Sequence, residues 1–287
     1  MTRHSFVAPI RWGDMDAQGH VNNSLYVDYL QEARAQFLLE GPNHHMLGGG
    51  VVVVGHQVEY VRPISYTEQP MVIDLFVSEV GAARFVIGYE LHHDGELCAR
   101  ARTVLCPFDF STGAPRRMTR EERGHFLTLR GELPPLRHLT SPALEGRGHH
   151  HPLQVRWSDL DSYGHVNNIR YFDYVQEARI AMTTEADPHT ARLGMSSDAP
   201  QYMWLVARQD VDYVVQMDYR LEAYDVVTAP VSLGTSSAVI ACEITDPLDG
   251  GRVLAKARTV LVCADPTGRP MALPDATRLA MEPLLVV

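Results

Sequence analysis

The sequence lacks several features that would place it in other classes of protein. It has 25 Lys and Arg against 35 Asp and Glu, a formal net charge of −10. Nucleic-acid-binding proteins are usually basic, so we set that class aside. No apolar run approaches the roughly 18–20 residues that a membrane helix needs. The first residues also hold no long apolar segment typical of a signal peptide. These absences predict a cytoplasmic protein with no membrane span.

Cysteine is scarce, and the common nucleophile and nucleotide motifs are missing. Cys98, Cys106, Cys242 and Cys263 lie in apolar, strand-like runs without C-x-x-C spacing. We therefore expect buried free thiols in a reducing compartment. No G-x-S-x-G elbow occurs, and no glycine fingerprint of a P-loop or dinucleotide site is present. A serine nucleophile and a phosphate cradle of those kinds are therefore not expected.

Histidines cluster twice, at residues 44–45 and 149–151. Neither run has a Cys or acidic partner at zinc-like spacing, and both lie in segments rich in Gly and Pro. We interpret both runs as solvated loops, and we expect no metal site.

The strongest feature of the sequence is an internal repeat. Residues 11–34 read RWGDMDAQGHVNNSLYVDYLQEAR, and residues 156–179 read RWSDLDSYGHVNNIRYFDYVQEAR. Without a gap, 16 of these 24 positions are identical. A repeat of this length indicates two copies of one structural unit.

Weaker matches continue downstream, where V-E-Y-V at 58 answers V-D-Y-V at 211 and A-R-T-V-L occurs in both copies. The repeat therefore predicts two domains of similar fold, residues 1–130 and 150–287. Residues 131–149 are interpreted as a linker. Before the linker, 119–129 is expected to form a short helix, with Thr119 as N-cap and Glu122 three residues on.

Each copy is expected to hold one long helix. From Tyr26, apolar side chains recur at i, i+3, i+4, i+7 and i+11, which forms one stripe of an α-helix. Asn22 or Asn23 is suited to cap its start, and Gly41-Pro42 ends it. The same pattern begins again at Tyr171.

A short strand over 6–12 is expected before the helix, and β-type runs follow it. These runs are rich in Val, Ile, Tyr and Phe and are separated by turn signals. They span 51–61, 71–80, 84–92 and 97–108 in the first copy, and 202–215, 225–233, 238–245 and 252–263 in the second. One helix per set of strands predicts an α+β fold, with an antiparallel sheet wrapped around the helix.

Polar residues crowd into the loop before each helix. Asp14, Asp16 and His20 precede the first helix, and Asp159, Asp161 and His165 precede the second in the same order. The start of a helix offers unpaired N–H groups and positive partial charge, which can stabilise an oxyanion. A carboxylate beside it can activate water or attack a carbonyl. This combination suits acyl transfer to water. Asp14, in the turn, is expected to be structural.

The string D-x-D-x-x-G-H-V-N-N-x-x-Y, followed by E-A-R, resembles the hot-dog thioesterases of the 4-hydroxybenzoyl-CoA, acyl-CoA and acyl-ACP types. It occurs in both copies. The resemblance implies two tandem hot-dog domains that form an intrachain pseudo-dimer, and hydrolysis of an acyl-CoA or acyl-ACP thioester. It implies active sites where two hot-dog units meet.

The resemblance also assigns residues. The catalytic carboxylate falls on Asp16 and Asp161, and the polar position seven residues later falls on Asn23 and Asn168. The catalytic-loop histidine of the acyl-ACP enzymes falls on His20 and His165. Those enzymes carry Asn where this chain has Gln18 and Tyr163, so the two copies differ there. The remaining loop residues implied in substrate binding are Gly19, Asn22, Gly164 and Asn167.

Several alternatives stay open. Another hot-dog subgroup uses a glutamate on the helix, and Glu32 and Glu177 are available for that role. A hot-dog hydratase or dehydratase, and a non-catalytic acyl-thioester-binding module, are competing functions. No cofactor is expected beyond the coenzyme A or phosphopantetheine of the substrate. Expected partners are acyl-CoA or acyl carrier protein, and a homodimer of fused chains. The candidates for contact with the phosphates of coenzyme A are Arg62, Arg102, Arg170 and Arg258, and the sequence does not choose among them.

Overall fold

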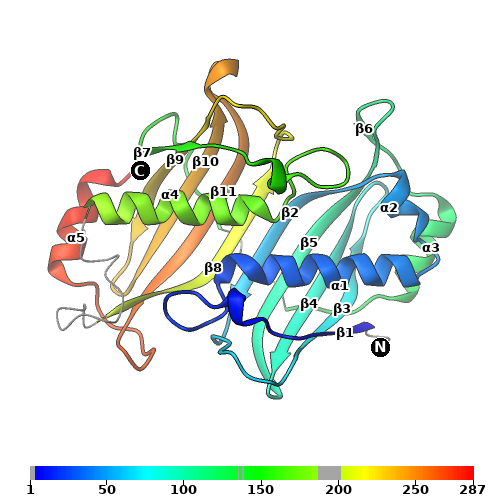
Figure 1. Cartoon of the computed structure of the whole chain (residues 1–287), viewed down its shortest axis with the longest axis horizontal. Helices are drawn as coiled ribbons and strands as arrows, with labels where there is room; N and C mark the ends of the chain where they lie inside the picture. The colour runs from blue at the N-terminus through cyan, green and yellow to red at the C-terminus, as the bar shows by residue number, and fades with distance from the viewer. Residues whose placement is uncertain (1–3, 135, 138, 187–201) are drawn as a thin grey trace. The chain divides into compact units, whose positions relative to one another are not determined.

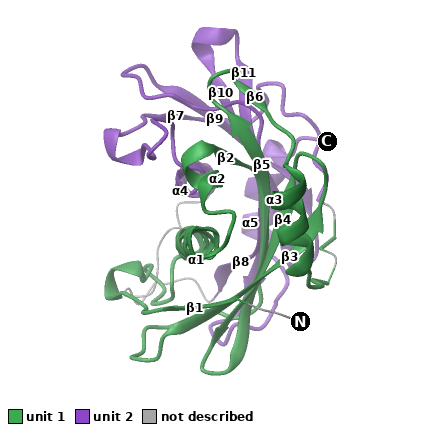
Figure 2. Cartoon of the chain, turned by 90° about the vertical axis from the view of Figure 1, so that its right-hand side faces the viewer, with its two compact units in different colours: residues 1–137 green, residues 138–287 purple. Residues whose placement is uncertain are grey.

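The computed structural model describes residues 4–134, 136–137, 139–186 and 202–287. The chain divides into two compact units, unit 1 of residues 1–137 and unit 2 of residues 138–287 (Figure 2). The division falls within the stretch that we interpret as linker. Each unit combines an antiparallel sheet with one long helix, so the predicted α+β class is confirmed.

In unit 1 the strands pair in the order β1-β3-β4-β5-β2, each antiparallel to its neighbour (Figure 1). The strands are β1 (His4–Ala8), β2 (Val51–Tyr60), β3 (Met71–Val80), β4 (Phe85–His93) and β5 (Glu96–Asp109), with the short β6 (Ala114–Pro115) on β5. The helices are α1 (Tyr26–Glu40), α2 (His45–Gly49) and α3 (Arg120–Thr128).

Unit 2 repeats this arrangement with the order β7-β9-β10-β11-β8. Its strands are β7 (His149–Leu153), β8 (Met203–Tyr213), β9 (Tyr224–Leu233), β10 (Ser237–Asp246) and β11 (Arg252–Ala264). Its helices are α4 (Arg170–Ala186) and α5 (Asp275–Met281). The predicted strands after the long helix are therefore confirmed in both copies, with ends that differ by one or two residues.

The long helix is held by its apolar stripe. Tyr26, Leu30, Ala33 and Phe37 are all buried, as the spacing predicted. Figure 2 shows the sheet of unit 1 curving around α1. Each large apolar side chain buried in this way contributes roughly 1.5–3 kcal/mol. The helix ends at Gly41, the predicted stop.

The arginine of each E-A-R motif is buried on the same helices. Arg34 donates from Nη1 to the hydroxyl of Tyr89 on β4 at 3.3 Å. In unit 2 the buried Arg179 lies near the thiol of Cys242. Burial raises the pKa of Cys242 to about 11, and the positive charge of Arg179 opposes that rise. The four cysteines are free and buried, as expected.

The short helix predicted over 119–129 is confirmed as α3. The hydroxyl of Thr119 accepts from the N–H of Glu122 at 3.1 Å, and the Glu122 carboxylate accepts from the N–H of Thr119 at 2.7 Å. This is the predicted capping box. Arg116 donates two further hydrogen bonds to the buried Glu122 carboxylate, and His45 contacts it at 2.9 Å. The bonds from Arg116 hold the pKa of Glu122 near 2, although burial alone would raise it.

We expect Glu122→Gln to lower the free energy of unfolding by about 2–3 kcal/mol at pH 7, because glutamine loses the charge-assisted bonds from Arg116. The folded-state pKa lies below the ordinary value. The carboxylate therefore stabilises the fold above that value, and its contribution fades as the pH falls from about 4.3 toward about 2. Urea unfolding of wild type and Glu122→Gln at pH 7 and at pH 3 measures the difference in their free energies of unfolding. We expect this difference to be smaller at pH 3. Glu121→Gln, an exposed neighbour, is the control. An equal difference in the free energy of unfolding at both pH values would contradict the predicted dependence on the charge of Glu122.

Three local predictions are wrong. The strand expected over 6–12 is β1, which ends at Ala8, and Trp12–Asp14 forms a 3-10 turn instead. The histidines at 149–151 lie in β7, because the backbone of this segment pairs with β9, and His149 also bonds Glu185 while His150 bonds Asp225. His45 begins the short helix α2, where it contacts Glu122. Long-range contacts, the pairing of β7 with β9 above all, therefore overrode the loop expected from the local Gly and Pro content.

No helix in the described part of the chain is long and apolar enough to cross a membrane.

Candidate active site

The first aspartate of each D-x-D motif is a structural residue, as expected. Asp14 is 5% exposed and accepts from the backbone N–H of Arg11 at 3.3 Å and from its Nε at 3.0 and 3.1 Å. The hydroxyl of Tyr29 on α1 donates to the same carboxylate. Asp14 therefore ties the 3-10 turn before the loop to the long helix.

Unit 2 builds the same cluster. Asp159 accepts from the N–H of Arg156 at 2.9 Å and from the Tyr174 hydroxyl at 2.8 Å. Burial raises the pKa of Asp159, but the bonds from Arg156 and Tyr174 outweigh it and hold that pKa below its ordinary value. This carboxylate stays ionised and fully bonded, so it is poorly suited to act on a substrate.

The second aspartate is held differently. Asp16 Oδ1 accepts from the backbone N–H groups of Gln18 at 2.8 Å and His20 at 3.2 Å. The Asp16 N–H donates to the His20 carbonyl at 2.7 Å, which closes the loop. Gly19 makes the turn at φ +78°, a conformation that favours glycine. The turn uses one carboxylate oxygen, and Asp16 is partly exposed.

The loop of unit 2 has matching geometry. Asp161 Oδ1 accepts from the N–H groups of Tyr163 at 2.9 Å and His165 at 3.3 Å. The Asp161 N–H donates to the His165 carbonyl at 2.8 Å, and Gly164 adopts φ +81°. The change from Gln18 to Tyr163 leaves this turn intact, because only the backbone N–H of that residue is used.

Each loop is fixed to the segment that follows the first strand after the long helix. The N–H of Val21 donates to the Ile64 carbonyl at 2.7 Å, and His20 pairs with Ser65. In unit 2 the N–H of Val166 donates to the Met217 carbonyl at 3.0 Å. His20 and His165 are thus placed in the same turn as the second aspartate.

The first asparagine of each N-N pair caps the helix start. Asn22 Oδ1 accepts from the N–H of Ser24 at 3.1 Å, and Asn167 Oδ1 accepts from the N–H of Ile169 at 3.3 Å. The backbone carbonyl of Asn22 also accepts from Leu25 at 2.9 Å. The cap therefore takes up two of the amides that we expected to face a substrate. The side-chain amides of Asn22 and Asn167 serve the fold, and their predicted role in binding substrate stays a prediction.

The second asparagine of each pair lies just before the long helix and is anchored by a tyrosine. The hydroxyl of Tyr60 donates to the Asn23 carbonyl at 2.8 Å, and Tyr213 donates to the Asn168 carbonyl at 2.7 Å. Sequence reasoning assigned no role to these tyrosines. The signal was present, since both belong to the V-E-Y and V-D-Y segments shared by the two copies.

The predicted site residues of each copy thus come together in one loop and one helix start. Asp16, Gly19 and His20 share a turn that leads directly to Asn23, and the positive end of α1 lies there. The helix glutamates lie apart from this group: Glu32 and Glu177 are exposed on the face opposite the apolar stripe. The geometry therefore favours the loop carboxylate over the helix glutamate as the reactive acid.

Each arginine considered for phosphate binding already pairs with a carboxylate of its own unit. Arg62 lies 3.5 Å from Glu96, and Arg170 lies 3.2 Å from Asp173. Arg102 pairs with Glu79, and Arg258 pairs with Asp212. The ion pairs do not single out one of the four.

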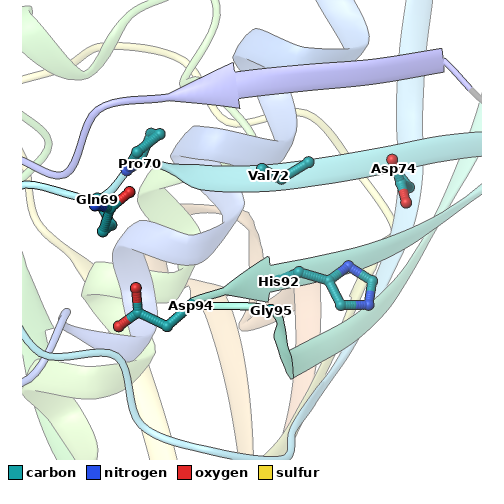
Figure 3. A pocket seen from close by; sticks show the side chains of 7 residues that line it. All are labelled: Gln69, Pro70, Val72, Asp74, His92, Asp94 and Gly95. Atoms are coloured by element: carbon teal, nitrogen blue, oxygen red, sulfur yellow. The ribbon is translucent and has the colours of Figure 1, made fainter.

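A pocket of about 470 Å³ opens on the sheet of unit 1 (Figure 3). Its lining is Gln69, Pro70, Val72, Asp74, His92, Asp94 and Gly95. None of the predicted site residues is among them, and two aspartates make the pocket unsuited to the phosphates of a carrier. Among the residues that the structure describes, no three His, Cys, Asp or Glu side chains gather as metal ligands.

Comparison with known proteins places both copies in one family. The model of the thioesterase-like superfamily matches residues 10–134 and again residues 155–281. Over 89 residues the chain is 34% identical to the uncharacterized protein YsmA of Bacillus subtilis (strain 168). That match covers 31% of this chain and 54% of the relative, so the chain spans about half of the relative's length.

Two solved structures share the fold over nearly the whole chain. The 12:0-ACP thioesterase from Umbellularia californica superposes with a TM-score of 0.70 at 17% identity, covering 91% of this chain and 97% of that one. An acyl-ACP thioesterase from Bacteroides thetaiotaomicron VPI-5482 gives a TM-score of 0.65 at 13% identity, with the same coverage of 91% and 97%. At these identities the likeness shows the fold alone.

Proposed function

This chain belongs to the thioesterase-like superfamily, and we propose that it hydrolyses acyl-CoA or acyl-ACP thioesters to a free acid and a thiol. The two family matches and the shared fold confirm the predictions of tandem hot-dog domains and of a thioester hydrolase. We propose the catalytic residues from the geometry of the two loops. No cofactor is required beyond the coenzyme A or phosphopantetheine of the substrate.

The observation that supports the proposal most is the contrast between the two aspartates of each motif. Asp14 is buried and bonded by Arg11 and Tyr29, whereas Asp16 is partly exposed and held by a turn that uses one of its oxygens. A fixed and accessible carboxylate is what a general base or nucleophile requires. Asp161 has the same placement in unit 2.

In the proposed reaction, the free oxygen of Asp16 or Asp161 takes a proton from a water whose oxygen bonds to the thioester carbon. The C–S bond then breaks, and the thiolate leaves and takes up that proton. If the carboxylate attacks the carbon itself, the C–S bond breaks and the thiolate leaves as a mixed anhydride forms. Water then cleaves the anhydride to the acid and the free Asp carboxylate, and the proton released goes to the thiolate. Asn23, Asn168 and the positive ends of the helices polarise the carbonyl. His20 and His165 serve proton transfer within the same loop.

A thiol-release assay with DTNB across short, medium, long and aryl acyl-CoAs, together with acyl-ACP, tests the proposal. We expect release of one thiol per acid formed, with a preference that identifies the acyl pocket and the carrier. Loss of the enoyl absorbance of crotonyl-CoA without thiol release would instead indicate a hydratase. Tight binding of coenzyme A without turnover of any substrate would indicate a binding module.

A further inference from the structure

A pair of exposed aromatic rings lies beside each candidate catalytic loop. In unit 1 the rings of Trp12, 74% exposed, and Tyr66, 44% exposed, meet edge to face with centroids 5.3 Å apart. In unit 2 Trp157, 74% exposed, and Tyr219, 39% exposed, meet at 5.4 Å. The interplanar angles are 84° and 89°. The same surface feature is therefore built twice.

Both rings of a pair are attached to the loop by its backbone. Trp12 opens the 3-10 turn that ends at Asp14, and its carbonyl accepts from the N–H of Met15 at 3.3 Å. Tyr66 directly follows Ser65, which pairs with His20. Trp12 is four residues from Asp16, so their Cα atoms lie at most about 14 Å apart. The aromatic pair thus has a fixed position close to the reactive carboxylate.

Packing within the unit does not explain the exposure of these rings. A tryptophan left in water forgoes the large stabilisation that burial of its ring would bring. Its neighbours Arg11 and Gly13 are also exposed, as are Arg156 and Ser158 beside Trp157. The immediate chain neighbours of all four rings are polar or small, and Leu221, two residues after Tyr219, is a further exposed apolar side chain. The exposed faces of these rings are suited to stack on one planar base.

We propose that each Trp–Tyr pair stacks against the adenine ring of a coenzyme A thioester while the thioester reaches the neighbouring loop. The assignment rests on the proposed function and selects coenzyme A as the carrier. Arg11 and Arg156 add positive charge beside the indole, partly neutralised by Asp14 and Asp159. The aromatic rings are therefore the elements to test.

The test compares an acyl-CoA with the matching acyl-pantetheine, which has the same thioester but no nucleotide. For Trp12→Ala with Trp157→Ala we expect the KM for acyl-CoA to rise about tenfold, since base–aromatic stacking is worth about 1–3 kcal/mol. The kcat for acyl-CoA and all constants for acyl-pantetheine should stay unchanged. Trp12→Phe with Trp157→Phe should retain most of the affinity. Leu39→Ala and Leu248→Ala, exposed apolar residues in other parts of the units, are matched controls.

Direct binding gives a readout independent of turnover. The chain has three tryptophans, so titration with adenosine 3′,5′-bisphosphate should quench fluorescence in wild type and much less in the double alanine variant, which keeps Trp204. An unchanged KM for acyl-CoA would overturn the assignment. An equal loss of kcat/KM for acyl-CoA and for acyl-pantetheine in the double alanine variant would also overturn it, because the rings would then shape the loop rather than bind the nucleotide. A rise in KM for acyl-ACP alone, or a change of oligomeric state, would make the pair a protein contact. If wild type cleaved neither thioester, the proposed function itself would fail.

Discussion

Replacing Asp16 and Asp161 together by asparagine is expected to abolish thioester hydrolysis while the fold stays intact. Loss of a general base lowers a rate by about 10²–10⁴-fold, and loss of a nucleophile lowers it at least as far. Asparagine keeps an Oδ1 that can accept from the N–H groups of Gln18 and His20, and of their counterparts in unit 2. The turn should therefore survive, and only the charge and basicity of the second oxygen are lost.

The two single variants assign activity to each copy. If each single variant keeps about half of the wild-type rate, both copies hold a working site. If only one single variant loses the activity, only that copy holds a working site. Gln18 and Tyr163, and Leu25 and Arg170, are positions where the copies differ beside the loop. Steady-state thiol release, with circular dichroism to verify folding, is the measurement.

Glu32→Gln with Glu177→Gln is the matched control for the double aspartate variant. Both glutamates are exposed on the long helices, so we expect their replacement to leave the rate unchanged. The loop mechanism would be contradicted if the aspartate double variant kept the wild-type rate and the glutamate double variant lost activity. The reactive acid would then be the helix glutamate.

Replacing the first aspartate should damage stability rather than chemistry. Asp14→Ala removes the acceptor of hydrogen bonds from Arg11 and leaves the buried hydroxyl of Tyr29 without its carboxylate partner. We expect a loss of about 2–4 kcal/mol in the free energy of unfolding, from several bonds of about 1 kcal/mol each and one stranded polar group. Asp159→Ala should act in the same way on unit 2. Urea unfolding measures the loss.

Asp16→Asn is the comparison for stability, because its turn keeps its acceptor. We expect it to change the free energy of unfolding by less than about 0.5 kcal/mol. A stable Asp14→Ala protein with a large fall in kcat would contradict the division of roles between the two aspartates.

The pH dependence of the first aspartate has a definite sign. The pKa of Asp159 is lower in the folded chain than its ordinary value, so its contribution to stability is complete above about pH 4. It is lost as the pH falls through the folded-state value. The difference in stability between wild type and Asp159→Ala should therefore narrow in acid.

Much of the architecture follows from local pattern. The apolar stripe from Tyr26 predicted the buried face of α1, and Thr119 with Glu122 predicted the capping box of α3. These features depend on residues a few positions apart, where spacing and short-range hydrogen bonds decide the conformation. The expected loop at residues 149–151 was wrong because its pairing partner, strand β9, is distant in sequence.

By itself the sequence determined the repeat, the class of fold and the loop in which we propose the chemistry. Periodicity, turn residues and a repeated motif can all be recognised from short segments of the chain. Only the tertiary structure supplied the contacts that distinguish the two aspartates of each motif. Asp14 and Asp16 are the same residue type two positions apart, and their difference arises because Arg11 and Tyr29 bury one of them while the turn leaves the other partly exposed. The tertiary structure also brought Trp12 and Tyr66 together beside that loop. Such contacts join segments that are far apart in the chain, so they exist only once the fold has formed.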